Sequence, residues 1–223
     1  MASEVKIKIC GITRIEDALV AAQAGVDLLG FNFYKKSPRY ITPEAAASNC
    51  DDLRSQLGNA CPILVGVFVN EVVGVISAIT RKAGLNCAQL HGDESDAMLK
   101  ELYGIGFKAI RPMNLAQALD DVNYFKPQFP TDERWPSLLL DAYHPNLYGG
   151  TGEEASTEVA VAVKRHTPRI MLAGGLTAEN VGGRIQAIQP WGVDTASGVE
   201  VEGQPGIKDH AKIRAFVDAV RQS

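Results

Sequence analysis

Lys8-Ile9-Cys10-Gly11-Ile12-Thr13 is the stretch of sequence that decides the fold. Apolar residues alternate through Val5, Ile7 and Ile9, which indicates a strand, and a thiol closes this strand directly before a glycine turn. An open doubly wound sheet would normally continue from its first strand into a G-x-G-x-x-G turn, and the residues after Cys10 do not supply one. The stretch therefore favours a closed barrel of parallel strands, with the open sheet as the alternative.

Strand-like and helix-like segments alternate along the whole chain. Short apolar runs predict strands near residues 5–10, 27–33, 62–68, 86–90, 106–111, 137–141, 169–173 and 192–196. Segments with helical periodicity follow them, at 16–24, 43–57, 72–83, 96–102, 116–122, 157–166, 178–188 and 209–220. The length of 223 residues is close to the ~250 residues of an eight-stranded βα barrel, and no linker divides the chain. We therefore expect an α/β fold with one domain over residues 1–223, a single eight-stranded parallel (β/α)8 TIM barrel.

Composition and charge limit the function classes. The formal net charge is -4, with 22 basic and 26 acidic residues spread along the chain, so no basic patch for nucleic acid is expected. No apolar run approaches the ~20 residues of a membrane helix, and residues 1–5 lack the basic and apolar regions of a signal peptide. The cysteines at 10, 50, 61 and 87 form no C-x-x-C pair or Cys/His cluster, which argues against a zinc site or a disulfide framework. We expect a cytoplasmic protein that acts on a small molecule.

Two residues at predicted strand ends are candidates for proton transfer. The site of such a barrel lies on the loops after the strands' carboxyl ends, where Cys10 and Asp141 both stand. A Cys10 thiolate could act as a base, although cysteine is also a common small buried residue. A catalytic role requires a lowered thiol pKa or a partner that removes the proton. Asp141 could donate a proton if partial burial keeps it protonated, or it could cap a turn or pair with a cation.

Other loop residues are candidates for binding an anionic ligand. Arg39 follows Ser37-Pro38 and suits a carboxylate, although a solvated loop arginine is the alternative. The glycine turns at Gly174-Gly175 and Ser197-Gly198 follow the last two predicted strands, where such barrels commonly bind phosphate. We expect Gly149 and Gly150 to belong to a flexible lid, with an ordinary long loop as the alternative. Gln89 and His91 should line the site, although His91 could equally be a packing or capping residue, and 127–136 should be an exposed loop without a catalytic role.

Taken in order, these motifs resemble the phosphoribosylanthranilate isomerase family over essentially the whole chain. The resemblance is carried by 8–13, 30–33 with 37–40, 89–92, 140–141, 149–152, 172–176 and Asp194 with 197–200. Each glycine motif alone is weak, but the ordered set falls on the loops where a barrel needs its functional groups. One departure is Ala196, because the family often has a serine there, and it puts phosphate affinity in doubt.

The resemblance implies an isomerase of tryptophan biosynthesis that needs no cofactor or metal. Its reaction converts N-(5'-phosphoribosyl)anthranilate to 1-(o-carboxyphenylamino)-1-deoxyribulose 5-phosphate, an Amadori rearrangement. Asp141 would be the general acid and Cys10 the general base, while Arg39 would hold the anthranilate carboxylate. The turns near Gly175 and Ser197-Gly198 would hold the phosphate, and Asp194 would join the substrate-binding set.

Two rival functions stay open at the level of sequence. One is another phosphosugar barrel, such as a pentose-phosphate epimerase or an indole-forming synthase; a metal-dependent epimerase needs histidine and carboxylate ligands, and the four histidines form no obvious set. The other is a non-catalytic barrel that binds a phosphorylated ligand. The sequence leaves monomer and homodimer equally open, because an apolar helix face can cover the barrel or a second subunit.

Overall fold

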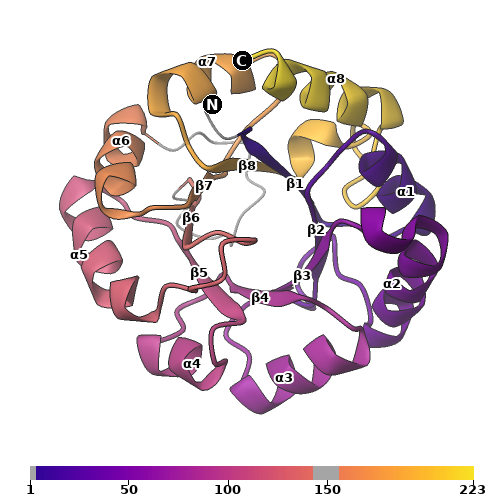
Figure 1. Ribbon diagram of the computed structural model, residues 1–223, viewed down its shortest axis with the longest axis horizontal. Helices are drawn as coiled ribbons and strands as arrows, with labels where there is room; N and C mark the ends of the chain where they lie inside the picture. The colour runs from indigo at the N-terminus through magenta and orange to yellow at the C-terminus, as the bar shows by residue number, and fades with distance from the viewer. Residues whose placement is uncertain (1–3, 143–155) are drawn as a thin grey trace.

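A computed structural model describes residues 4–142 and 156–223, and in this part of the chain eight parallel strands close into one barrel. The strands follow one another around the barrel in chain order, and helices surround them (Figure 1). Strand β8 pairs with β1, which closes the sheet and leaves no open edge. The predicted (β/α)8 barrel is confirmed, and the open doubly wound sheet is excluded.

The elements lie close to their predicted ranges. The strands are β1 Lys6–Cys10, β2 Leu28–Asn32, β3 Ile63–Phe68, β4 Cys87–Leu90, β5 Gly106–Ile110, β6 Leu138–Leu140, β7 Ile170–Leu172 and β8 Gly192–Thr195. The helices are α1 Ile15–Gln23, α2 Pro43–Leu57, α3 Val73–Lys82, α4 Asp96–Glu101, α5 Leu115–Phe125, α6 Thr157–His166, α7 Val181–Ile188 and α8 His210–Arg221. Short 3-10 turns lie at η1 Gly58–Ala60, η2 Lys126–Gln128 and η3 Ser197–Val199.

Helix α7 begins later than its predicted start at residue 178. The side chain of Asn180 accepts a hydrogen bond from the Thr177 N–H at 2.8 Å and donates one to the Gly175 carbonyl at 2.9 Å. These bonds favour a turn over a first helical turn, because asparagine side chains compete with the helix for backbone groups. The loop after β7 is therefore held in shape by its own side chain.

The alternation in β1 gives its two faces different roles. Ile7 and Ile9 are fully buried in the apolar layer between strands and helices. Successive side chains of a strand point to opposite faces, so Lys8 and Cys10 point into the barrel. The pattern that predicted the strand thus also aims the thiol at the interior.

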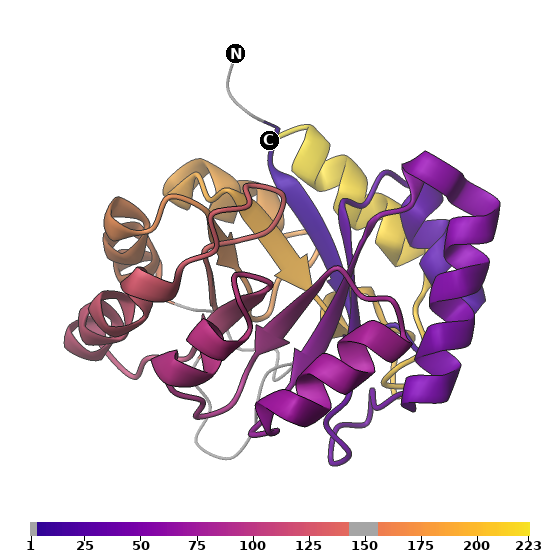
Figure 2. The same cartoon turned by 60° about the horizontal axis from the view of Figure 1, so that its bottom comes forward.

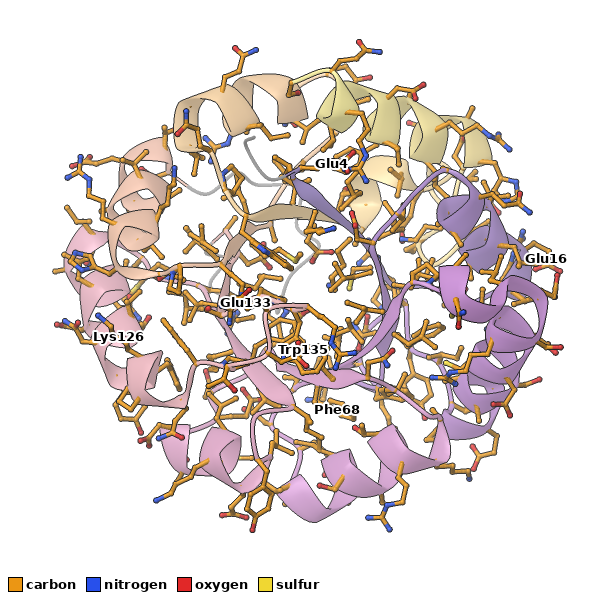
Figure 3. All side chains as sticks on the ribbon, in the orientation of Figure 1. Glu4, Glu16, Phe68, Lys126, Glu133 and Trp135 are labelled. Atoms are coloured by element: carbon orange, nitrogen blue, oxygen red, sulfur yellow. The ribbon has the colours of Figure 1, made fainter. Side chains whose placement is uncertain are left out.

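The barrel's interior is closed at the amino ends of its strands by the segment before β6. Figure 1 shows this segment crossing the barrel opening, and Figure 3 shows Trp135 over the interior. Trp135 is only 5% exposed and packs with inward-facing residues of the strands, among them Phe107, Leu139 and Met171. The guanidinium of Arg169 donates hydrogen bonds to the carbonyls of Trp135, at 3.1 Å, and of Pro130. The prediction of an exposed loop over 127–136 is therefore wrong at its end, because an indole there fills the base of the barrel.

We expect Trp135→Ala to lower the free energy of unfolding by about 3–5 kcal/mol, because it removes a large buried side chain and leaves a cavity. Urea denaturation followed by circular dichroism measures this change. Glu133→Ala, two residues away at an exposed position, is the matched control. A loss below about 1 kcal/mol, the size of an ordinary surface substitution, would contradict the conclusion that Trp135 fills the base of the barrel.

The carboxyl ends of the strands lie on the other side of the barrel. The strand arrows in Figure 2 point to one side, and the C-terminus lies at the opposite side. Cys10 and Asp141, at or just after strand ends, are therefore on the face opposite Trp135. No helix in the described part of the chain is long and apolar enough to span a membrane.

Candidate active site

One cavity at the carboxyl ends of the strands brings together residues that are far apart in the sequence. Its empty space is about 860 Å³ when the open solvent at its mouth is included. Among the residues that line it are Cys10 from β1, Arg39 after β2, Asp141 after β6 and Asp194 from β8. The predicted acid and base therefore face the same space from strands on different sides of the barrel (Figure 1).

Cys10 is packed closely against its neighbours at the base of this cavity. A Cβ atom at Gly30 on the adjacent strand would lie 2.8 Å from the Cys10 sulfur, so glycine is required there. Burial raises the pKa of the Cys10 thiol above its ordinary value, although the charges of Lys8 and Lys208 lower it. Burial therefore works against the first route to a catalytic thiolate, a lowered thiol pKa, and favours the second, in which a nearby group receives the proton.

A buried ion pair lies next to this thiol. Lys8 is fully buried, and its Nζ is 3.0 Å from Oδ2 of Asp194. The two residues sit opposite each other in the β1–β8 register. Sequence reasoning missed Lys8, although its place two residues before Cys10 puts both side chains on the inward face.

Asp141 ends a buried chain of three polar side chains. Its Oδ2 is 3.1 Å from Nε2 of His91, and Nδ1 of His91 is 2.8 Å from Nε2 of Gln89. The other carboxylate oxygen, Oδ1, accepts the Ala142 N–H at 2.8 Å. With the Gln89 amide donating to Nδ1, the ring carries its proton on Nε2 and donates it to Asp141. His91 and Gln89 line the cavity as predicted, but both ring nitrogens of His91 are used inside the protein.

Arg39 lines the cavity on a loop that is held by several contacts. Its backbone N–H donates to Oγ of Ser37 at 3.1 Å, and Nδ2 of Asn32 donates to the same oxygen at 3.2 Å. The guanidinium meets Glu200 with two bonds of 2.7 Å, from Nε to Oε1 and from Nη2 to Oε2. One edge of the guanidinium is therefore already paired, so a ligand carboxylate would meet the side that carries Nη1.

Glu200 is the second functional residue that sequence reasoning missed, although it lies in the quoted motif. It also accepts the Gly206 N–H at 2.9 Å and the Lys208 ammonium at 3.1 Å. Burial alone would raise the pKa of Glu200, but the hydrogen bonds and charges of Arg39 and Lys208 hold it below its ordinary value. Glu200 is therefore a carboxylate that fixes the position of Arg39.

The two predicted glycine turns lie side by side at the cavity. Gly174 and Gly175 have φ angles of 92° and 59°, in the left-handed region that glycine adopts easily. A Cβ at Gly198 would lie 2.0 Å from the Leu176 carbonyl oxygen, so only glycine allows the loops after β7 and β8 to touch. Ser197 begins η3 and lines the cavity with Gly174 and Gly175. Within the described residues, no hydrogen bond uses the backbone N–H of Gly174 or Gly175, and such N–H groups suit a phosphate.

Two further predictions concern the lid glycines and the binding of a metal ion. Gly149 and Gly150 lie outside the residues that the structure describes. Over the described residues, no group of three or more His, Cys, Asp and Glu side chains is arranged to hold a metal ion.

Comparisons with known proteins agree on one family. The family model described as "N-(5'phosphoribosyl)anthranilate (PRA) isomerase" matches residues 7–219. A curated N-(5'-phosphoribosyl)anthranilate isomerase from Chlorobaculum tepidum is 46% identical over 223 residues, covering 98% of this chain and 96% of the relative.

Solved structures give the same result for the fold. The phosphoribosyl anthranilate isomerase of Thermotoga maritima aligns with a TM-score of 0.83 and 33% identity, covering 98% of this chain and 100% of the other. A structure of this kind of enzyme in complex with reduced 1-(o-carboxyphenylamino)-1-deoxyribulose 5-phosphate aligns with a TM-score of 0.80 and 32% identity over 98% of this chain and 100% of the other.

Proposed function

This chain belongs to the N-(5'-phosphoribosyl)anthranilate isomerase family, and from that premise we propose that Cys10 and Asp141 are the base and the acid of its reaction. The enzyme is an isomerase of tryptophan biosynthesis, and its reaction is the Amadori rearrangement of N-(5'-phosphoribosyl)anthranilate. The observation that carries the residue roles is the position of Cys10 and Asp141, which face one cavity from β1 and from the loop after β6. An isomerisation that moves protons between oxygen and carbon needs such a pair.

In the first step Asp141 protonates the ring oxygen of the ribose, the C1–O bond breaks, and the lone pair of the nitrogen forms the C1=N bond of a protonated imine. His91 and Gln89 suit this step because they stabilise the negative charge that forms on Asp141. The Gln89 amide holds the ring with its proton on Nε2, and that N–H donates to the carboxylate left on Asp141 once the acid has given its proton to the sugar.

In the second step Cys10 removes the proton from C2 of the sugar. The electrons of the C2–H bond form an enolamine, and the C1=N electrons move to the nitrogen. The enolamine then tautomerises to the amino-ketone. The thiolate needed for this step is unfavourable in the unliganded protein, because burial raises the pKa of Cys10. The base must therefore lose its proton to a nearby group before it acts.

Two anion sites hold the substrate at its ends. Gly174, Gly175, Ser197 and Gly198 would hold the phosphate through backbone N–H groups, and Arg39 would hold the anthranilate carboxylate. Ala196 leaves this phosphate site without one hydroxyl donor. Asp194 contributes through its contact with Lys8, and Gly149 and Gly150 remain predicted lid residues.

We expect Arg39→Lys to raise KM by roughly 10- to 100-fold with a smaller change in kcat, because one charge-assisted bond contributes about 1.5–3 kcal/mol. Glu200→Gln should also raise KM, because it removes the carboxylate that fixes the position of Arg39. Steady-state kinetics separate the two parameters, and Arg81→Lys on exposed α3 is the control. An unchanged KM in Arg39→Lys would contradict the assignment.

The proposed function as a whole is tested by adding purified protein to freshly made phosphoribosylanthranilate and following the loss of anthranilate-type fluorescence. Turnover to a product with the mass of the substrate supports the isomerase. A ligand-binding barrel would bind the substrate without turnover, and another phosphosugar enzyme would act only on its own substrate. The same assay with and without a chelator tests the prediction that no metal is needed.

We also propose a single catalytic domain that works as a monomer or a homodimer in the cytoplasm. One chain supplies Cys10, Asp141, Arg39 and both glycine turns, so the site needs no second copy. The strands of the one barrel run from Lys6 to Thr195, which supports one domain. All of the cysteines are free thiols, as a reducing compartment requires.

A further inference from the structure

We propose that Lys8 is a positioning residue whose single buried charge is shared by Cys10 and Asp194, so that the proton of the base passes to Asp194 when the thiolate forms. This inference rests on the proposed role of Cys10 as the base. It supplies the proton acceptor that a buried thiol requires. Neither Lys8 nor Asp194 needs to contact the reacting atoms for this role.

The geometry places Lys8 beside both acids. Lys8 Nζ is 3.0 Å from Oδ2 of Asp194, and the Lys8 side chain and the Cys10 sulfur pack against the same glycine, Gly30, on the neighbouring strand. Lys8 is fully buried and Asp194 is 7% exposed, so their ion pair is largely shielded from water. The Cβ-free surface of Gly30 lets both side chains pack there, since an added Cβ would lie 2.8 Å from the sulfur and 3.3 Å from Lys8 Cε.

Charge balance in this small group favours one negative charge at a time. Burial alone would lower the pKa of Lys8, but Asp194 and Cys10 raise it, so the lysine stays positive. Burial raises the pKa of Cys10 and of Asp194, and Lys8 lowers both. Lys8 supplies one positive charge, so a second negative charge in this group would be unpaired. An unpaired buried charge is costly, and a state with both Cys10 and Asp194 ionised is therefore unfavourable.

The proton step is balanced within these three side chains. The S–H bond of Cys10 breaks and an O–H bond forms on Asp194, while the lysine keeps its charge. Solvent in the cavity, which Cys10 and Asp194 both line, can carry the proton between them. The outcome is a thiolate beside an ammonium group and a neutral Asp194, with the same net charge as before.

Other charged groups around Cys10 and Asp194 are already paired with one another. Lys208 and Arg39 act on Cys10, and both are bound to Glu200. Asp141 and His91 act on Asp194, and they are bound to each other. Lys8 is therefore the cation for whose positive charge Asp194 and the Cys10 thiolate compete directly.

The test is the pH dependence of Cys10 alkylation by iodoacetamide in the absence of substrate, read by mass spectrometry of the peptide that contains Cys10. All proteins carry Cys61→Ser, because Cys61 is partly exposed, whereas burial raises the pKa of Cys50 and of Cys87 to about 12. Lys6→Met is the matched control, because Lys6 lies on the same strand with its own partner Asp27, at 2.8 Å.

The two substitutions should move the alkylation midpoint in opposite directions. Asp194→Asn removes the competing carboxylate, so the midpoint should fall by at least about one pH unit. Lys8→Met removes the shared cation, so the midpoint should rise by at least about one unit. Lys6→Met should leave it unchanged. A general loss of packing would expose the thiol in both variants and move both midpoints the same way.

An Asp194→Asn midpoint that is unchanged or higher overturns the proposal, even if Lys8→Met fails to fold. This result is separate from the proposed function, because alkylation is measured without substrate. If Cys10→Ala keeps full isomerase activity, the role of Cys10 as base fails, whatever the alkylation midpoints show. If activity is lost in Cys10→Ala but the midpoints do not move, only the shared-cation proposal fails.

Discussion

Cys10→Ala should lower kcat by about three orders of magnitude, within the usual contribution of a general base. The substitution removes the only thiol that lines the cavity among the described residues. The phosphate turns and Arg39 remain, so affinity for the substrate should change little. Steady-state kinetics by fluorescence measure both effects, and Cys61→Ser, at a partly buried thiol outside the cavity, should keep wild-type rates. A kcat within tenfold of wild type would remove Cys10 from the mechanism.

The pH dependence of the wild-type enzyme follows from the same thiol. The value of kcat/KM reports groups of the free enzyme, in which burial raises the pKa of Cys10. The thiolate fraction should therefore rise with pH up to a value above the ordinary thiol pKa, which the alkylation of wild-type Cys10 measures directly, whereas kcat/KM also depends on the proton that Asp141 must carry. An alkylation profile that falls across this range while the protein stays folded would argue against a thiolate base.

Asp141→Asn should also lower kcat by about three orders of magnitude, because an amide has nearly the shape of the carboxyl group but cannot donate a carboxylic acid proton to the ring oxygen. The contacts to His91 and Ala142 can persist, so the cavity should keep its form. Circular dichroism and the kinetics of Asp51→Asn, at an exposed position of α2, serve as controls. Near wild-type turnover in Asp141→Asn would move the acid role to another group.

Much of the fold could be predicted because its signals are local. Strand β1 shows why, since alternating Ile7 and Ile9 indicate both the strand and the direction of Cys10. The ends of β6 and β8 likewise place Asp141 and Ser197 at the cavity on the expected face. In a parallel barrel, knowing the end of a strand is nearly enough to know where its last side chain lies.

The parts that could not be predicted depend on contacts between distant segments. The pairing of Arg39 with Glu200 joins loops separated by most of the chain, and no local pattern shows that one edge of the guanidinium is used. Lys8 reads as a surface lysine until Asp194 is found beside it across the β1–β8 seam. Trp135 is preceded by charged residues typical of a loop, and its burial follows only from closure of the barrel around it.

Single-turnover kinetics with enzyme in excess of phosphoribosylanthranilate test the central claim most directly, when wild type, Cys10→Ala, Asp141→Asn and the double variant are compared. The account predicts fast loss of fluorescence in the wild type and rates about 10³-fold lower in each single variant. The double variant should lose less than the product of the two effects, because residues that act as a unit are not additive. A single variant that turns over at nearly the wild-type rate would contradict the assignment of acid and base to this cavity.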